Sequence, residues 1–452
     1  MFKEKLALVL VILLNILPML YFLGIRRSLW WDEVVYFSLG KSILKGKYEI
    51  APGRDAFRPF LFPFLLSLVL SMNGEFLVRI MIMIFTALSI TTTYYMGKKL
   101  FNMQVGFLSI LTLSSFPFFI FFSNKILAEM VFLTFTSLAV TTFYLGVEKN
   151  KKFLYFSAIL TALSILTKYF GFLLLIIYLV YILFRKKIQI FKRGELYISF
   201  LIFGLILIPW FMINILHYGN LLGGIFENAD IFLSLQENQP FYFFLINSWE
   251  IFGLSIIFIP LGIFFTIKDR KANSLLILIY ALIPFLFFSS MPHKEARYLV
   301  SFFPAFSCLI GFVVQRIAKK FRVFTYGTMI LILILGLYLG CKEVLKEEVD
   351  VDVLMEGSLF VKQITRENEY VMSESYPYLS YYAGRMSIRP PIDKKNFYSL
   401  FEEYNISYVF IDHLELGNPN YLLEELRTNK FEEVKSFTNQ KERMVTIYRK
   451  LF

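Results

Sequence analysis

Residues 6–25 read LALVLVILLNILPMLYFLGI, twenty consecutive positions without a charged side chain. About 20 apolar residues in a helix cross the roughly 30 Å hydrocarbon core of a bilayer, so this stretch predicts a membrane-spanning helix. The chain continues directly into Arg26, Arg27 and Trp30, without the small-residue pattern at which a signal peptide is cleaved. We therefore interpret the segment as a retained anchor.

The composition of the whole chain agrees with this first segment. Of its 452 residues, 57% are hydrophobic and 18% are charged, and the mean hydropathy is +0.61. Soluble domains hold roughly 45–50% apolar residues. The sequence therefore excludes a soluble globular enzyme, a disordered chain and a collagen-like fibre, and its two Cys exclude a disulfide-stapled module. A mainly helical, multi-pass membrane protein is left.

Eleven apolar segments predict about eleven transmembrane helices. They lie near residues 6–25, 76–96, 104–122, 126–147, 153–167, 170–184, 196–217, 241–266, 274–291, 298–315 and 323–341. A further apolar stretch, residues 59–72, is only about 14 residues long, which suits an interfacial or re-entrant segment better than a full span.

The basic residues give an independent check on this count. If residues 59–72 do not cross, nearly every basic cluster falls on one face of the membrane, as the positive-inside rule requires. The clusters are Lys3/Lys5, Lys98/Lys99, Lys149/Lys151/Lys152, Arg185/Lys186/Lys187/Lys192/Arg193, Lys268/Arg270/Lys271 and Arg316/Lys319/Lys320/Arg322. We therefore expect a cytoplasmic N-terminus and an extracytoplasmic C-terminus in a cell membrane.

The sequence changes character after the last apolar segment. Residues 342–452 hold 15 Lys and Arg against 19 Asp and Glu, which leaves 31 basic and 15 acidic residues before them. Alternating runs at 370–373 and 408–412 predict short strands, and 397–405 and 420–436 predict helices. We expect a transmembrane domain over 1–344, with a first extracytoplasmic loop at 26–74, and a small extracytoplasmic α/β domain over 345–452. Because the basic excess lies beside apolar spans, we attribute it to cytoplasmic loops and exclude nucleic-acid binding.

Acidic residues stand at the predicted outer ends of two spans. Asp32 and Glu33 follow two Trp residues that are explained as interfacial anchors, whereas anchoring requires no acid. A carboxylate beside Trp at a dehydrated interface would have a raised pKa and could act as a base. Glu129 opens the fourth apolar segment, where the helix dipole favours an acid. Solvated acids and dipole-supported packing are the alternatives for these residues.

Cationic residues stand at the same outer ends, against the positive-inside trend. They are Arg58, Lys168, His293, Lys294 and Arg297, and Tyr298 follows the last of them. Several cations near the outer interface suit an anionic ligand such as a lipid phosphate, although each alone is also explained by snorkelling from a helix end. His293 has no nearby His or Cys with which to bind a metal.

Taken in order, these residues resemble glycosyltransferase family 39 and its relatives, the protein O-mannosyltransferases and lipid A aminoarabinose transferases of the GT-C membrane fold. The motifs that carry the resemblance are Trp31-Asp32-Glu33 with Tyr36, Leu39-Gly40 and Ile43-Leu44-Lys45-Gly46, Arg58-Pro59-Phe60-Leu61-Phe62-Pro63, Gly97-Lys98-Lys99-Leu100-Phe101, Pro117 with Glu129, Leu166-Thr167-Lys168, Pro209-Trp210, Tyr218-Gly219 and Arg297-Tyr298-Leu299. They extend over about residues 30–300. A WWDYG motif is absent from the C-terminal part, which argues against an oligosaccharyltransferase.

The resemblance implies a hexosyl- or pentosyltransferase. Its donor would be a polyprenyl- or dolichyl-phosphate-linked sugar, and its acceptor an extracytoplasmic protein, lipid or glycan. It also implies Asp32 as general base and Glu129 as a residue that orients the acceptor or assists Asp32. Arg58, Lys168 and Arg297 would hold the donor phosphate, and we add His293, Lys294 and Tyr298 to that site and Glu33 to the catalytic acids.

Two further expectations concern a metal site and the alternative functions. The metal pair that the aminoarabinose transferases imply needs an acid two residues before Arg58, where this chain has Ala56, so the sequence supports no divalent metal and no other cofactor. The alternative function is a polyprenol-sugar or lipid transporter that uses the cations without Asp32 as a base. A structural membrane subunit is the third reading.

Overall fold

The computed structural model describes residues 2–25, 28–51, 54–55, 58–72, 74–234, 238–414, 418–440 and 442–451. Arg26, Arg27 and Ala56, used in the sequence analysis, lie outside them. The chain divides into two compact units, which are described separately. The helical unit comprises Met1–Gly24, Phe57–Leu65 and Met72–Glu343, and the C-terminal unit comprises Ile25–Ala56, Leu66–Ser71 and Val344–Phe452. The first loop therefore groups with the C-terminal sheet, which composition did not predict.

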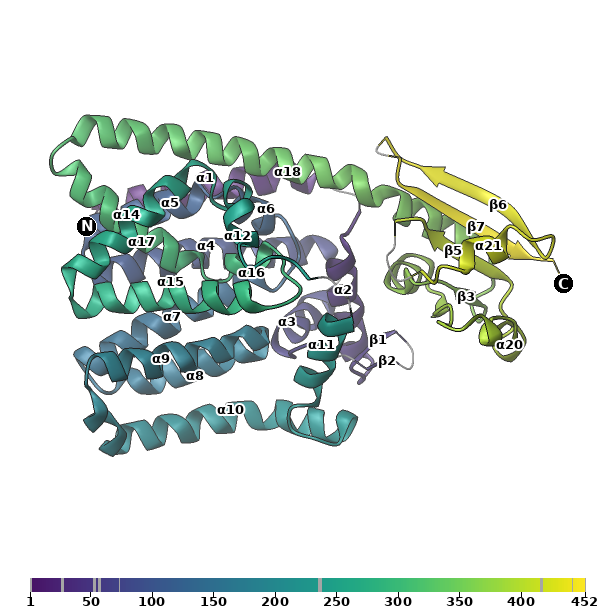
Figure 1. Ribbon diagram of the computed structural model, residues 1–452, viewed down its shortest axis with the longest axis horizontal. Helices are drawn as coiled ribbons and strands as arrows, with labels where there is room; N and C mark the ends of the chain where they lie inside the picture. The colour runs from purple at the N-terminus through teal and green to yellow at the C-terminus, as the bar shows by residue number, and fades with distance from the viewer. Residues whose placement is uncertain are drawn as a thin grey trace. The chain divides into compact units, whose positions relative to one another are not determined.

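The helical unit consists of helices joined by short connections (Figure 1). They are α1 (Phe2–Leu23), α4 (Glu75–Leu100), α5 (Met103–Ser114), α6 (Pro117–Ser123), α7 (Glu129–Glu148), α8 (Phe153–Thr167), η1 (Tyr169–Phe172), α9 (Leu173–Phe184), η2 (Ile188–Lys192), α10 (Gly194–Tyr218), α11 (Gly223–Ser234), α12 (Phe243–Ile246), α13 (Ser248–Phe252), η3 (Gly253–Ile257), α14 (Phe258–Asp269), α15 (Ala272–Ser290), α16 (Arg297–Val300), α17 (Phe303–Ala318) and the first part of α18 (Arg322–Ile364). Helix α3 (Leu61–Leu70) is divided between the two units.

Every apolar segment that predicted a span forms a helix or a broken helix. Within the described residues, seven helices are long and apolar enough to cross a membrane, and eight if the bent pair α5–α6 forms one span. The shorter apolar helices α8, η1–α9 and α17 correspond to the other three predicted spans, so the count of eleven stays a prediction. Helix α3 covers the ambiguous stretch 59–72 and has only 10 residues.

Contacts between loops gather the basic clusters at one end of the helical unit. Gln315 donates from Nε2 to Asn102 Oδ1 at 2.8 Å, and Asn273 donates from Nδ2 to the Leu100 carbonyl at 2.7 Å. Ion pairs join the loops in the same way: Lys98 with Glu4, Arg316 with Asp269, Arg185 with Glu148 and Lys151 with Glu195. We call this the basic end. It is the arrangement that the positive-inside argument requires.

Small residues let the helices of this unit approach closely. Helices α4 and α5 cross at Gly97 and Gly106, where a Cβ atom on Gly97 would lie 2.8 Å from the Gly106 Cα. Glycine is common at such crossings because it allows two helix backbones to come into contact. Helix α7 packs against α4 and α8, α8 packs against α10, and α15 packs against α9 and α17.

The C-terminal unit contains a five-stranded sheet in the order β4-β3-β5-β7-β6 (Figure 1). Its elements are α2 (Trp31–Leu44), β1 (Glu49–Ala51), β2 (Arg54–Asp55), β3 (Tyr370–Met372), α19 (Tyr376–Tyr378), η4 (Leu379–Ala383), β4 (Met386–Ile388), η5 (Lys394–Asn396), α20 (Phe397–Glu403), β5 (Tyr408–Asp412), α21 (Leu422–Leu426), β6 (Phe431–Thr438) and β7 (Met444–Lys450). Strands β4, β3 and β5 are parallel, and β7 and β6 are antiparallel to their neighbours. The predicted α/β fold of this region is confirmed.

One local prediction in this unit was wrong. The helix predicted over 420–436 ends at Leu426, and Phe431–Thr438 is the edge strand β6. Its partner is β7, with Phe431 opposite Lys450 and Thr438 opposite Met444. Pairing with a neighbouring strand overrides the local preference of such a segment, because strand propensity depends strongly on context.

Both faces of the sheet are covered, which explains why β5 is apolar at every central position. Val409 and Ile411 pack into a core formed with α20 and α21. Phe410 faces the opposite side, where a Cβ atom on Gly357 of α18 would lie 3.0 Å from its ring. Alternate residues of a strand point to opposite faces, so helices on both sides bury the whole strand.

Candidate functional site

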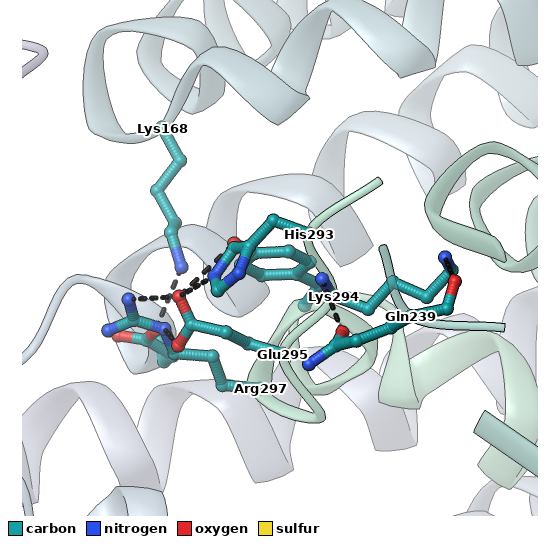
Figure 2. A network of polar contacts seen from close by, with 8 residues as sticks. Lys168, Gln239, His293, Lys294, Glu295 and Arg297 are labelled. Carbon is teal, nitrogen blue, oxygen red and sulfur yellow. Dashed lines mark hydrogen bonds and ion pairs between the residues drawn. The ribbon is translucent and has the colours of Figure 1, made fainter. Parts of the chain in front are cut away.

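The predicted outer residues of the helical unit gather at the end opposite to the basic end. Helix α7 begins there at Glu129 and ends at the basic loop 149–152, and α8 runs back from that loop to Lys168. The loop 291–296 between α15 and α16 completes the group (Figure 2). We call these residues the site end.

A buried ion pair joins two of the predicted residues. Lys168 donates from Nζ to Glu129 Oε1 at 2.8 Å, and the two side chains are 15% and 3% exposed. Glu129 is the first residue of α7, where the positive end of the helix dipole stabilises a carboxylate. Lys168 follows α8 in an extended conformation, with φ −149° and ψ 136°, and so ends that helix. Sequence analysis predicted both residues but gave them separate roles.

A second carboxylate, that of Glu295, is contacted by three of the other predicted residues. Arg297 contacts both of its oxygens, with Nε 2.5 Å from Oε2 and Nη2 2.8 Å from Oε1. Tyr298 donates from Oη to Oε1 at 3.1 Å, and His293 Nε2 lies 3.3 Å from the same oxygen. The two-point contact with Arg297 is the strongest geometry available to a carboxylate–guanidinium pair.

Sequence analysis missed Glu295, although it quoted the run from His293 to Tyr298. The available signal was an acid two residues before an Arg and three before a Tyr. The Tyr298 N–H donates to the Glu295 carbonyl at 3.0 Å, so residues 295–298 form a tight turn. That turn brings the side chains of Arg297 and Tyr298 back onto Glu295.

An aromatic contact places the two carboxylate groups in neighbouring parts of the unit. The Tyr298 ring packs 5.3 Å from Phe170 and 5.3 Å from Phe288, measured between ring centroids. Phe170 belongs to η1, which begins directly after Lys168. In Figure 2 the side chain of Lys168 points toward the group formed by Glu295, Arg297 and His293.

Lys294 is directed elsewhere. Its Nζ donates to the Gln239 carbonyl at 2.6 Å and to the Met291 carbonyl, and its backbone N–H donates to Gln239 Oε1 at 2.7 Å (Figure 2). The Gln239 N–H donates in turn to the Pro292 carbonyl at 3.1 Å. Burial lowers the pKa of Lys294. Lys294 therefore links two loops through these hydrogen bonds, none of which involves Glu295.

Arg58 lies in the helical unit, three residues before α3, and its side chain is half-buried. The buried Pro59 and the stacked rings of Phe60 and Phe64, 5.4 Å apart, continue the segment into α3. Pro59 restricts the backbone of the residue before it to extended conformations.

Asp32 and Glu33 lie in the C-terminal unit, at the first turn of α2. Glu33 is fully buried, and its Oε2 accepts a hydrogen bond from the Trp30 N–H at 2.8 Å. An acid at this position satisfies a backbone donor that the helix cannot use, so Glu33 caps α2. Asp32 is 6% exposed and lies at the positive end of the same helix dipole.

Comparison with known proteins shows what the chain is similar to. Residues 57–213 match the family model described as dolichyl-phosphate-mannose-protein mannosyltransferase, and no curated protein matches the chain. One similar solved structure is ArnT from Cupriavidus metallidurans bound to undecaprenyl phosphate, with 15% identity, 97% of each chain covered and a TM-score of 0.72. Another is the oligosaccharyltransferase AglB from Archaeoglobus fulgidus with an inhibitory peptide and a dolichol-phosphate, with 14% identity, 91% and 69% covered and a TM-score of 0.63.

These matches confirm the GT-C membrane glycosyltransferase fold and the resemblance on which it was predicted. The fold extends over nearly the full length of this chain, well beyond the residues that the family model covers.

Proposed function

We propose that this chain is an integral-membrane glycosyltransferase that moves a sugar from a polyprenyl- or dolichyl-phosphate donor to an extracytoplasmic acceptor. The observation that carries the proposal is the site end itself: two carboxylate–cation groups, one buried and one half-buried, at one end of a GT-C helical unit. Buried charges inside an apolar helical unit are costly and mark substrate or ion sites in membrane proteins. The lipid phosphates bound by ArnT and AglB support the donor class.

The donor phosphate is the group that we assign to the cations. Its anionic oxygens would compete with Glu129 for Lys168 and with Glu295 for Arg297, so each carboxylate holds its cation in position until a donor arrives. When the bond from the anomeric carbon to the phosphate oxygen breaks, negative charge grows on the phosphate. A fixed cation at that point stabilises the transition state by a few kcal/mol.

Asp32 is the residue that we assign as general base. It would take the proton from the acceptor hydroxyl as the new glycosidic bond forms, and lipid phosphate would leave from the opposite side of the sugar ring with inversion at the anomeric carbon. Such proton transfer contributes about 10²–10⁴-fold to the rate. We assign Glu33 to holding the start of α2, Glu129 to orienting Lys168, and Arg58 and His293 to the donor phosphate. Tyr298 would position Glu295, and Lys294 would fix the loop that carries both.

The test is direct transfer by the purified full chain. The chain is incubated with polyprenyl- and dolichyl-phosphate-linked hexoses and pentoses carrying a labelled sugar, and the labelled product is identified. We expect transfer with one donor class, and a loss of about 10²-fold or more in kcat for Asp32→Asn. The control Glu403→Gln changes an exposed acid of α20 and should retain full activity. Movement of the intact donor across vesicles without any product would overturn the proposal in favour of a transporter.

We also propose that the site end and the C-terminal unit face away from the cytoplasm. Support comes from the basic end, because basic loops are retained in the cytoplasm. A reporter that is active only in the cytoplasm, fused after Phe452, should stay silent, and one inserted in the loop 149–152 should be active. The reverse pattern would contradict the orientation.

A further inference from the structure

The first-loop helix α2 is bound by a tyrosine-rich turn of the C-terminal unit. At its start, the Trp31 ring makes edge contacts with Tyr376 and Tyr378, with centroids 5.9 Å and 5.8 Å apart. The Leu29 N–H, just before the helix, donates to Tyr382 Oη at 3.0 Å. These contacts fix the residues on both sides of Trp30. Trp31 directly precedes Asp32, the base of the proposed reaction.

The second and third turns of α2 meet one tyrosine of the same segment. The Phe37 ring lies 5.5 Å from the ring of Tyr381, and Lys41 Nζ lies 4.0 Å from the centroid of that ring. Phe37 and Lys41 are four residues apart, so they share one face of the helix. A cation over an aromatic face is attracted by the ring quadrupole. Tyr381 therefore fixes how α2 is rotated about its axis.

The tyrosine segment follows the carboxyl end of strand β3. Strand β3 has β4 on one side and β5 on the other, and both are parallel to it. The chain therefore leaves β3 toward one edge of the sheet and later returns to its other side, which makes β3 and β5 the switch point of the sheet. Ligands of such sheets bind outside the carboxyl ends of the strands at this switch point. Helix α19 begins at Tyr376, four residues after β3 ends at Met372.

Tyr378 contacts α2 directly, because its ring packs against that of Trp31. Burial raises its pKa well above the usual value, the charge of Arg443 lowers it, and the charges of Glu33 and Asp412 raise it further. Asp412 is the last residue of β5, and Arg443 donates to both of its carboxylate oxygens. The Trp31 ring of α2 contacts the same buried tyrosine.

The turn that binds α2 is itself anchored to the end of α18. The buried Arg385 guanidinium donates to the carbonyls of Lys362 at 3.1 Å and Thr365 at 2.8 Å, and to the carbonyl of Ala383 at 3.1 Å. Lys362 lies in the last turn of α18 and Thr365 directly follows that helix, where a cation is favoured by the helix dipole. The third is the last carbonyl of η4, a π-helix, and such helices occur frequently at functional sites.

We propose that the C-terminal unit binds the chain's own first-loop helix through the tyrosines that follow strand β3, and that Tyr381 and Tyr382 are positioning residues that hold Asp32 for transfer. The inference rests on the proposed function, because it gives the small α/β domain a role in that reaction. A catalytic group has to be held within about 0.5 Å of its productive position by its surroundings. Four tyrosines and one anchored π-helix add that support to a loop whose helix α2 also packs against β1 and, at Gly40, against Leu66 and Leu70 of α3.

The test uses the purified full chain and two measurements. The first is hydrogen exchange of backbone amides in residues 28–44, and the second is the dependence of transfer on donor concentration. For Tyr382→Phe, which removes the acceptor of the Leu29 N–H, we expect amide exchange at residues 29–34 to quicken about tenfold. We expect kcat to fall about tenfold while KM for the donor stays unchanged.

The ring of Tyr381 allows a sharper pair of variants. Tyr381→Ala should quicken exchange over residues 35–44 and lower kcat, whereas Tyr381→Phe keeps the ring and should restore both to the original values. The control Tyr404→Phe changes a tyrosine that packs against Tyr370, and should alter neither measurement.

The two measurements separate this inference from the proposed function. If the original chain transfers no sugar, the proposed function fails, and hydrogen exchange still decides whether η4 holds α2. If transfer is observed and neither Tyr382→Phe nor Tyr381→Ala changes the exchange of α2 or kcat, the positioning role is overturned while the transferase activity stands.

Discussion

The two ends of helix α8 carry the same kind of ion pair in different surroundings. At the site end, Lys168 contacts Glu129 of α7, and their side chains are 15% and 3% exposed. At the basic end, Lys151 contacts Glu195 of α10 at 3.3 Å, and their side chains are 51% and 29% exposed. Exposed pairs contribute little, because water and salt screen them, whereas a buried charge needs its partner. The comparison shows that two ion pairs at the ends of one helix differ in depth, and that depth decides how much each contributes.

Removing the cation of the buried pair should have the largest effect. Lys168→Met leaves Glu129 charged and without its ammonium in an apolar interior, which should lower the free energy of unfolding by about 3–5 kcal/mol. The double variant Glu129→Gln/Lys168→Met should recover most of that stability, since neither charge is left. Thermal unfolding in detergent measures both.

Donor use should not recover in the double variant. If Lys168 grips the donor phosphate, the double variant keeps a raised KM for the donor although its melting temperature is restored. A double variant with restored stability and an ordinary donor KM would reduce the pair to a structural contact and remove the difference between the two ends of α8.

Arg297 provides the next largest effect. A charge-assisted contact to phosphate contributes about 1.5–3 kcal/mol, so Arg297→Ala should lower the donor-limited rate roughly 10–150-fold. Arg297→Lys should restore only part of it, because a two-point fork becomes a single point charge. The matched control is Arg316→Lys, at the basic end, where the arginine pairs with Asp269. Full activity in both lysine variants would show that Arg297, like Arg316, is held only by its carboxylate.

Hydropathy and charge were sufficient to predict most of the fold. The eleven apolar segments all formed helices, because burial of apolar side chains in lipid leaves the backbone no alternative that satisfies its hydrogen bonds. Strand β5 formed over the predicted residues 408–412. Strand β6 was missed because its pairing with β7 is decided by residues that follow it in the chain, which a local pattern does not contain.

The site was predicted residue by residue but not as an arrangement. Glu129 and Lys168 are 39 positions apart, and their pairing depends on how α7 packs against α8, which no local pattern encodes. Glu295 was overlooked because an acid between cationic residues has no evident role until the turn at 295–298 is known. The contact of α2 with η4 joins segments more than 330 residues apart, which only tertiary structure could reveal.

Lys294 should have a smaller and different effect. Lys294→Met removes the ammonium that donates to the carbonyls of Gln239 and Met291, so the loop 291–296 should loosen. We expect a loss of about 1–3 kcal/mol in stability and a modest loss of activity with an unchanged donor KM. A raised donor KM at full stability would instead support the role predicted from the sequence, in which Lys294 binds the donor phosphate.

The smallest effect belongs to the exposed pair with which the comparison began. Lys151→Met is the same chemical change as Lys168→Met, made at the other end of the same helix. It should shift the melting temperature by no more than about 2 °C, because half of the Lys151 side chain is in water and its ion pair is screened. Donor KM and kcat should stay unchanged, and raising the salt concentration should abolish even the small difference in stability. A loss of stability comparable to that of Lys168→Met would mean that exposure does not separate the two pairs, and the charges at the basic end would then need a role beyond topology.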